Sequence, residues 1–166
     1  MAILEIGAGT GRLTRPLLQA GFKVDVVEPD RKSVEILKTI ILNKAKIYSF
    51  IPNKKYAAIV GTDILHHIDI NQYLPILYKH LLPNGLICFS EPNGLNPFWY
   101  LMPQVFLFWN LEKGIVSTTK SNLTNILLNN NYQNIEIKGL WLYYRLIISA
   151  IRKISPPTNS DPHLFP

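Results

Sequence analysis

The stretch "LEIGAGTGR", Leu4 to Arg12, decides how this chain folds, because a short apolar run ends abruptly at three alternating glycines. The apolar run, Ala2 to Ile6, is typical of a buried parallel strand. Gly7 and Gly9 lack a Cβ, so they can take positive φ and let a ligand lie directly on the backbone. The helix expected from Arg12 to Ala20 leaves its first N–H groups free to donate. The stretch therefore predicts a ligand-binding turn, with a tight turn that binds nothing as the alternative.

Strands and helices alternate along the chain. The residue pattern predicts strands at Ala2–Ile6, Lys23–Val27, Lys46–Phe50, Ala57–Thr62, Leu86–Ser90 and Asn134–Gly139, and helices at Arg12–Ala20, Arg31–Leu42, Ile70–Leu82 and Ser121–Asn129. Asp30 is expected to cap the second helix, and Pro83 to Gly85 to end the third. An α/β fold with a mostly parallel sheet and helices on both faces accounts for this order.

The composition fits one globular domain. The 166 residues are 48% hydrophobic and 17% charged, with a net charge of +6. This charge favours an anionic partner such as a membrane surface or nucleic acid, or it only keeps an apolar protein in solution. The single cysteine, Cys88, favours a reducing compartment, and nothing before the first strand is typical of a signal peptide. The longest uncharged apolar stretch, Phe98 to Trp109, is too short to span a bilayer. We therefore expect a cytoplasmic protein.

The spacing of the glycines separates two classes of ligand. A dinucleotide-binding loop has the pattern G-x-G-x-x-G, but here Arg12 occupies the sixth position and the third glycine is Gly11. Glu5, just before the loop, would repel a pyrophosphate and suits a cationic group. A nicotinamide-dependent oxidoreductase is therefore disfavoured. Glu28, at the expected end of the second strand, is placed to accept hydrogen bonds from both hydroxyls of a ribose, with a surface or helix-capping acid as the alternative.

Four segments together resemble the motifs of class I S-adenosylmethionine-dependent methyltransferases of the small type 11 group. They are "LEIGAGTGRLTRPLLQAG", "VDVVEPD", "AAIVGTDILHHI" and "LLPNGLICFSEPN", and they follow one another from Ala2 to Asn93. The resemblance implies a Rossmann-like three-layer sandwich that binds S-adenosyl-L-methionine and transfers its methyl group directly to an O, N or C nucleophile. This cofactor combines a sulfonium cation, an amino-acid head group and an adenosine, which suits a glycine loop flanked by acids.

The resemblance also assigns residues to the cofactor. It places Glu5 and the loop from Gly7 to Gly11 at the methionine end, with Thr62 and Asp63 beside it. The expected cofactor-binding residues are Glu5, Gly7, Ala8, Gly9, Thr10, Gly11, Glu28, Pro29, Thr62 and Asp63.

Two adjacent histidines follow the fourth expected strand. In the resembling family the second one often faces the reaction cleft, so His67 is the candidate catalytic residue, as a general base or a substrate contact. Packing in the interior is the alternative for either ring. Glu91 is a candidate for the edge of the cleft, or a salt-bridged surface acid. No cluster of Cys, Asp or Glu accompanies the histidines at metal-ligand spacing, so no metal site is expected.

The chain departs from the family pattern in several places. It begins on the first strand, "SFIPNKKYAA" offers no acid for the adenine amino group, and Ala57 stands where Asp is common. Leu140 to Ile154 is typical of an amphipathic helix rather than of a seventh, antiparallel strand. The expectation is a Rossmann-like domain shortened at both ends. It is either a compact methyltransferase or a non-catalytic module that docks on a membrane or a partner protein.

The expected organisation is a methyltransferase domain at 1–139 with an aromatic insert at 95–117, an apolar C-terminal helix at 140–154 and a flexible tail at 155–166. The insert contains "NPFWYLMPQVFLFW", which carries no charge. Together with "LWLYYRLIISAIRK" it is predicted to form a lid over an apolar acceptor or to dock on an anionic bilayer, with ordinary core as the alternative. This favours a small or lipid-like methyl acceptor over nucleic acid, and peripheral membrane association as an alternative location.

Overall fold

The computed structural model describes residues 2–101, 107–139 and 143–154. The chain forms two compact units. The first, here called the sheet unit, consists of Met1–Thr62, His80–Phe89 and Leu142–Pro166; the second, the helical unit, consists of Asp63–Lys79 and Ser90–Trp141.

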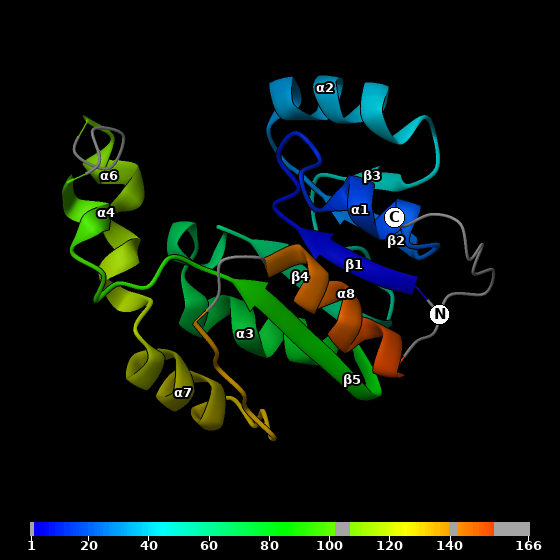
Figure 1. The fold of residues 1–166 in the computed structure, drawn as a ribbon. Helices are drawn as coiled ribbons and strands as arrows, with labels where there is room; N and C mark the ends of the chain where they lie inside the picture. Colours follow the sequence, from blue (N-terminus) through cyan, green and yellow to red (C-terminus); the bar gives the residue numbers. More distant parts are fainter. Residues whose placement is uncertain (1, 102–106, 140–142, 155–166) are drawn as a thin grey trace. The chain divides into compact units, whose positions relative to one another are not determined.

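Five strands form one sheet in the order β3-β2-β1-β4-β5 (Figure 1). Their bounds are β1 Ala2–Ile6, β2 Lys23–Val27, β3 Lys46–Tyr48, β4 Tyr56–Thr62 and β5 Leu81–Ser90. The central strand β1 pairs in parallel with both β2 and β4. The chain adds β2 and β3 on one side of β1 and then β4 and β5 on the other side. Sheets of this kind bind ligands where the side changes, at the carboxyl ends of β1, β2 and β4. A Rossmann-like α/β fold is confirmed.

Three helices belong to the sheet unit: α1 Thr14–Gln19, α2 Arg31–Ile41 and α8 Tyr143–Ile154. Their apolar side chains share one buried cluster with one face of the sheet. This cluster includes Ile3, Val24, Val26, Ala58 and Val60 from the strands and Leu17, Leu37, Ile41, Ile147, Ile148 and Ile151 from the helices. The expected cap of α2 is confirmed, since the Asp30 carboxylate accepts a hydrogen bond from the Ser33 N–H at 2.8 Å.

The helical unit contains short helices joined by turns. They are η1 Leu65–His67, α3 Ile70–Lys79, α4 Phe98–Leu101, α6 Trp109–Glu112, η2 Lys113–Ser117 and α7 Lys120–Asn129. The Tyr132 hydroxyl donates to the Leu74 carbonyl at 2.9 Å, and its ring meets Tyr78 edge-on. These contacts hold the segment after α7 on α3.

Several expected boundaries shift in the structure, among them the start of β5 from Leu86 to Leu81 and the end of β3 from Phe50 to Tyr48. Helix α1 begins at Thr14 rather than Arg12, because Gly11 has a φ of +89° and the turn it makes delays the helix. Helix α3 ends at Lys79, and Pro83 to Gly85 lie within β5 instead of ending the helix. β5 is an edge strand of the sheet, which is where strands tolerate a proline.

The strand expected at Asn134–Gly139 is wrong, because the structure has no regular secondary structure in these residues. Asn134, the first residue of this range, adopts a left-handed φ of +54°, which does not fit an extended strand. The C-terminal helix is present as α8, while residues 140–142 and the expected tail at 155–166 lie outside the described part. In that part, no helix is long and apolar enough to cross a membrane.

Candidate cofactor-binding loop and histidine cluster

The glycine loop follows β1 directly and has the backbone that its sequence predicts. Gly7, Gly9 and Gly11 all adopt left-handed φ values, of +66°, +53° and +89°. A Cβ at Gly9 would find no atom within 4 Å, whereas one at Gly11 would lie 2.8 Å from the Leu37 Cδ1 atom. Gly11 therefore packs closely against Leu37 of α2. At Gly9 the backbone borders open space, as a loop that lets a ligand approach closely must do.

Glu28 ends β2 and joins that strand to the glycine loop. Its carboxylate, which is 7% exposed, accepts the Gly9 N–H at 2.6 Å through Oε2 and the Asp30 N–H at 2.9 Å through Oε1. A carboxylate oxygen has two lone pairs, so each oxygen can accept one more hydrogen bond. The Glu28 carboxylate is thus fixed in place and can still receive two further donors, such as two neighbouring hydroxyls.

Glu5 is a carboxyl group on the apolar face of the sheet. It pairs with Val26 and Val60 in register and is 1% exposed. Burial raises the pKa of Glu5 to about 7; Thr14 offsets part of this rise, and the charge of Glu28 adds to it. Although Thr14 lies close, neither Glu5 Oε2 nor Thr14 Oγ1 has a hydrogen-bond partner among the described residues. A buried carboxyl with an unpartnered oxygen is suited to receive a donor from a ligand.

The other expected cofactor residues lie beside these strand ends. Ala8 is buried and Thr10 exposed in the loop, Pro29 follows Glu28, and Thr62 ends β4 half-buried. The sheet unit therefore brings together nine of the ten expected residues at the carboxyl ends of β1, β2 and β4. Asp63 begins the helical unit with a left-handed φ of +52°, and its N–H donates to the Ser90 carbonyl at 2.8 Å.

His66 is the centre of a buried polar cluster in the helical unit. Its Nδ1 lies 2.7 Å from Glu91 Oε2, and its Nε2 lies 3.3 Å from Glu112 Oε2. Burial alone would lower the pKa of His66, but the hydrogen bond and charge of Glu91, with Glu112 and Asp63, raise it above its ordinary value. Glu91 Oε1 accepts the N–H groups of Ile64 and Leu65, each at 2.9 Å.

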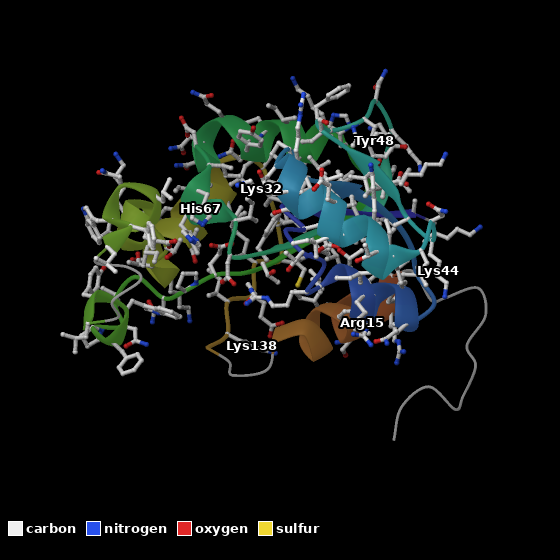
Figure 2. The ribbon with its side chains drawn as sticks, turned by 90° about the horizontal axis from the view of Figure 1, so that it is seen from above. Arg15, Lys32, Lys44, Tyr48, His67 and Lys138 are labelled. Carbon is white, nitrogen blue, oxygen red and sulfur yellow. The ribbon has the colours of Figure 1, made fainter. Side chains whose placement is uncertain are left out.

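His67, the candidate catalytic residue, is exposed beside the ring of His66, with the two ring centroids 4.0 Å apart (Figure 2). Its Nδ1 lies 3.1 Å from the carbonyl oxygen of Leu111. A carbonyl only accepts, so Nδ1 carries the proton and Nε2 holds the lone pair. His67 can therefore take a proton, or bind a cation, through Nε2.

Sequence analysis did not identify Glu112, and it treated Glu91 as a cleft-edge or surface acid. Glu91 does pair with a histidine, but the pair is buried, since the side chains of His66 and Glu91 are 3% and 5% exposed. Glu112 reaches His66 only because η2 lies directly against η1: a Cβ on Gly114 would clash with the His66 carbonyl. In the sequence, the one local sign of this contact is Gly114, two residues after Glu112. Such a spacing is too common to identify a site by itself.

The parallel sheet and the glycine loop define a Rossmann-like domain, and a family model identifies which one. The model described as a methyltransferase domain matches residues 1–137, so the chain belongs to this methyltransferase family. The resemblance to class I S-adenosylmethionine-dependent methyltransferases is confirmed, and the type 11 group within them stays a prediction.

Similar proteins agree with this family. The ubiquinone biosynthesis O-methyltransferase of Rickettsia prowazekii is 26% identical over 156 residues, covering 84% of this chain and 62% of that protein. An uncharacterized methyltransferase of Alkaliphilus oremlandii is 33% identical over 95 residues, covering 53% of this chain and 44% of that one. The chain thus spans less than two thirds of the length of these relatives.

Solved structures share the fold. The glycopeptide N-methyltransferase MtfA, complexed with S-adenosyl-L-methionine, has a TM-score of 0.50 and 20% identity over 53% of this chain and 46% of its own. An S-adenosylmethionine-dependent methyltransferase from Clostridium acetobutylicum has a TM-score of 0.50 and 18% identity, covering 63% and 46% of the two chains.

Proposed function

We propose that this chain binds S-adenosyl-L-methionine and transfers its methyl group to a small or lipid-like acceptor. The main observation behind this proposal is the Glu28 carboxylate at the end of β2, which accepts hydrogen bonds from the N–H groups of Gly9 and Asp30. Each of its oxygens can accept one more hydrogen bond. This arrangement suits the two neighbouring hydroxyls of a ribose. Family membership supports the same cofactor.

The residues at the strand ends also fit the methionine part of the cofactor. The open space at Gly9 allows the ligand to lie on the backbone, and the unpartnered Glu5 Oε2 can accept from an ammonium group. Glu5 and Glu28 repel each other, and a cationic ligand near them would relieve this repulsion. Acids beside an open glycine loop favour a sulfonium cofactor over a dinucleotide.

The chain's own residues would contribute positioning and proton transfer. When bound, the cofactor supplies an electrophilic methyl group on a sulfonium, which an acceptor oxygen, nitrogen or carbon attacks from the side opposite sulfur. Glu28 and the glycine loop fix the donor, and holding both reactants in line can be worth roughly 7–11 kcal/mol. His67 is proposed to contact the acceptor and to take its proton at Nε2.

A lipid-like acceptor is proposed from the exposed surface of the aromatic insert. Seven of its large apolar side chains among the described residues are more than half exposed: Leu95, Phe98, Leu101, Leu107, Phe108, Leu111 and Val116. Exposed apolar side chains in such number are typical of a contact with a lipid or a partner. The names of the Rickettsia relatives, enzymes of ubiquinone biosynthesis, support an acceptor of this class. Residues 102–106 of the insert lie outside the described part.

The C-terminal segment "LWLYYRLIISAIRK" is also predicted to take part in this contact. From Ile147 onward its apolar side chains lie in the core of the sheet unit, with Ile151 fully buried. This part of α8 therefore packs on the sheet and is not available to an acceptor or a bilayer. The proposal rests on the insert alone.

Calorimetric titration with S-adenosyl-L-methionine tests the proposal. We expect saturable binding of one molecule per chain, strongly weakened in Gly9→Ala, because the new Cβ would occupy the ligand's space and strain the left-handed backbone. The fold should persist in this variant, since no protein atom lies within 4 Å of that Cβ. Absence of binding to the unaltered chain would instead support a non-catalytic module that retains only the scaffold.

A further inference from the structure

Three side chains of the helical unit, two from η1 and one from the end of α6, can each offer an atom to one cation. The ligating atoms of His66, His67 and Glu112 all lie within 4.8 Å of one another. From this geometry we propose that His66, His67 and Glu112 form a binding site for a divalent transition metal ion of the Zn²⁺ class. The proposal goes beyond the methyltransferase function and does not depend on it.

Hydrogen bonds fix the orientation of both imidazole rings. His66 Nδ1 lies 2.7 Å from a carboxylate oxygen of Glu91, and His67 Nδ1 lies 3.1 Å from the Leu111 carbonyl. Histidines that bind metals usually donate one ring N–H to a carboxylate or a backbone carbonyl, which leaves the other nitrogen to the metal. Both kinds of partner are present here, one for each ring. Nε2 is therefore the nitrogen that each histidine offers.

The distance between His66 and Glu112 suits a shared ion. Bonds of about 2.0–2.2 Å in a tetrahedral arrangement place two ligand atoms about 3.3–3.6 Å apart, and His66 Nε2 lies 3.3 Å from Glu112 Oε2. An ion at this place replaces the proton that otherwise joins the two atoms. A ligand atom of His67 lies within 4.8 Å of both of these atoms, so the same ion can reach it through a small shift.

The fold builds this arrangement from buried and closely packed parts. Glu91, 5% exposed, is anchored by the backbone N–H groups of Ile64 and Leu65, so it holds His66 in place without itself being needed as a ligand. Gly114 lies against the His66 carbonyl, where a side chain would clash, and this brings Glu112 to the ring. The position of each ligand is thus set by contacts outside the ligand itself.

The donor set favours the Zn²⁺ class over harder ions. Two imidazoles and one carboxylate are the protein ligands of one known type of zinc site, which keeps a fourth position open. Mg²⁺ and Ca²⁺ prefer oxygen ligands and would gain little from the histidines. Because a bound ion would take the Nε2 lone pair of His67, metal binding and proton acceptance by that nitrogen exclude each other.

Titration of the full chain, freed of metal with a chelator, tests the site without any cofactor or acceptor. Co²⁺ serves as a visible probe and Zn²⁺ as its competitor. We expect a ligand-field absorption that saturates at one ion per chain and disappears on addition of Zn²⁺. Glu112→Gln and His67→Ala should each weaken Co²⁺ binding at least about tenfold.

Matched control variants distinguish this site from binding elsewhere. His80 is a half-buried histidine whose Nδ1 also meets a backbone carbonyl, that of Lys54, so His80→Ala should leave Co²⁺ affinity unchanged. Glu35→Gln is the corresponding control for an exposed carboxylate. Circular dichroism checks that every variant is folded. The proposal is overturned if the unaltered chain gives no saturable absorption, or if Glu112→Gln and His67→Ala bind as tightly as the controls. The cluster would then be an ion pair only.

Discussion

Glu5 is the residue at which folding and ligand binding conflict most clearly. An acidic side chain on the apolar face of a sheet, with an oxygen that finds no partner, weakens the fold unless it is protonated. A sequence that placed Val or Ile here would pack better in the cofactor-free protein. The presence of a carboxyl at this position is therefore best explained by what it does for a cationic ligand.

The pH dependence of unfolding tests this conflict at Glu5. Burial raises its pKa from 4.5 to about 7, so between these values the folded chain holds a proton that the unfolded chain has released. The contribution of Glu5 to stability is thus present below pH 4.5 and is lost as the pH rises to about 7. Glu5→Gln removes this titration. Relative to the unaltered chain, the variant should gain on the order of 3 kcal/mol between about pH 5 and pH 8.

Urea denaturation of the cofactor-free chain at both pH values measures this gain. Glu35→Gln, which changes an exposed glutamate, is the control and should show no such pH-dependent difference. If the difference in unfolding free energy between Glu5→Gln and the unaltered chain were the same at both pH values, Glu5 would titrate normally in the folded protein.

Glu28 is the residue proposed to bind the ribose, so its removal should weaken the binding of the cofactor. Glu28→Ala should cost on the order of 1.5–3 kcal/mol of binding free energy, the usual worth of hydrogen bonds to a charged acceptor. Calorimetry with S-adenosylhomocysteine measures this loss without turnover. Because Glu28 also accepts from the Gly9 and Asp30 N–H groups, a denaturation curve must accompany the measurement. Unchanged affinity in a folded variant would show that the ribose is bound elsewhere.

Among the helices and strands, the central strands could be predicted from the sequence, whereas the end of α3 and the segment Asn134–Gly139 could not. Ala2–Ile6 and Lys23–Val27 are predicted to the residue, because a short apolar run that ends at a glycine or a proline has few alternatives. The end of α3 is misjudged because Pro83 stops a helix in most settings but is tolerated in an edge strand. Asn134–Gly139 alternates like a strand, yet it begins with a left-handed Asn134 and forms no strand.

The candidate sites differ in the same way. The glycine loop and Glu28 are predictable because they follow directly on strands whose ends must meet at one edge of the sheet. Glu112 could not be predicted, because it reaches His66 through the packing of η2 on η1. Such a contact leaves no periodicity or local spacing in the sequence. Residues fixed by the topology can be predicted, whereas those fixed by loop packing need the structure.

Gly114 tests the packing of η2 on η1. A Cβ there would clash with the backbone of His66, which cannot yield as a flexible side chain would. Gly114→Ala should lower the free energy of unfolding by about 1–3 kcal/mol, as overpacking usually does. Gly139→Ala is the matched control, because a Cβ at Gly139 would meet nothing within 4 Å. Equal stability of the two variants would contradict the contact between the two short helices, and urea denaturation compares them directly.

For the whole molecule, both the net positive charge and the exposed apolar side chains of the insert favour binding to an anionic bilayer. The chain carries a net charge of +6 and a pI of about 9.4. Basic side chains such as Arg15, Lys32 and Lys44 point outward on the sheet unit (Figure 2). A positive protein is attracted to an anionic bilayer, where exposed Phe and Leu side chains can insert at the headgroup level. A lipid-like acceptor would be met at such a surface.

Co-sedimentation with vesicles tests this last proposal. We expect the chain to bind vesicles that contain phosphatidylglycerol at low salt, to bind pure phosphatidylcholine weakly, and to be released as salt screens the charges. The double variant Phe98→Ser/Leu101→Ser, whose residues are 64% and 79% exposed on the insert, should bind the anionic vesicles less. The control is Phe50→Ser/Leu42→Ser, which removes the same two residue types, 74% and 68% exposed, from the sheet unit. If both double variants lose binding equally, the attraction is not specific to the insert, and if the unaltered chain does not bind at low salt, the insert has no membrane role.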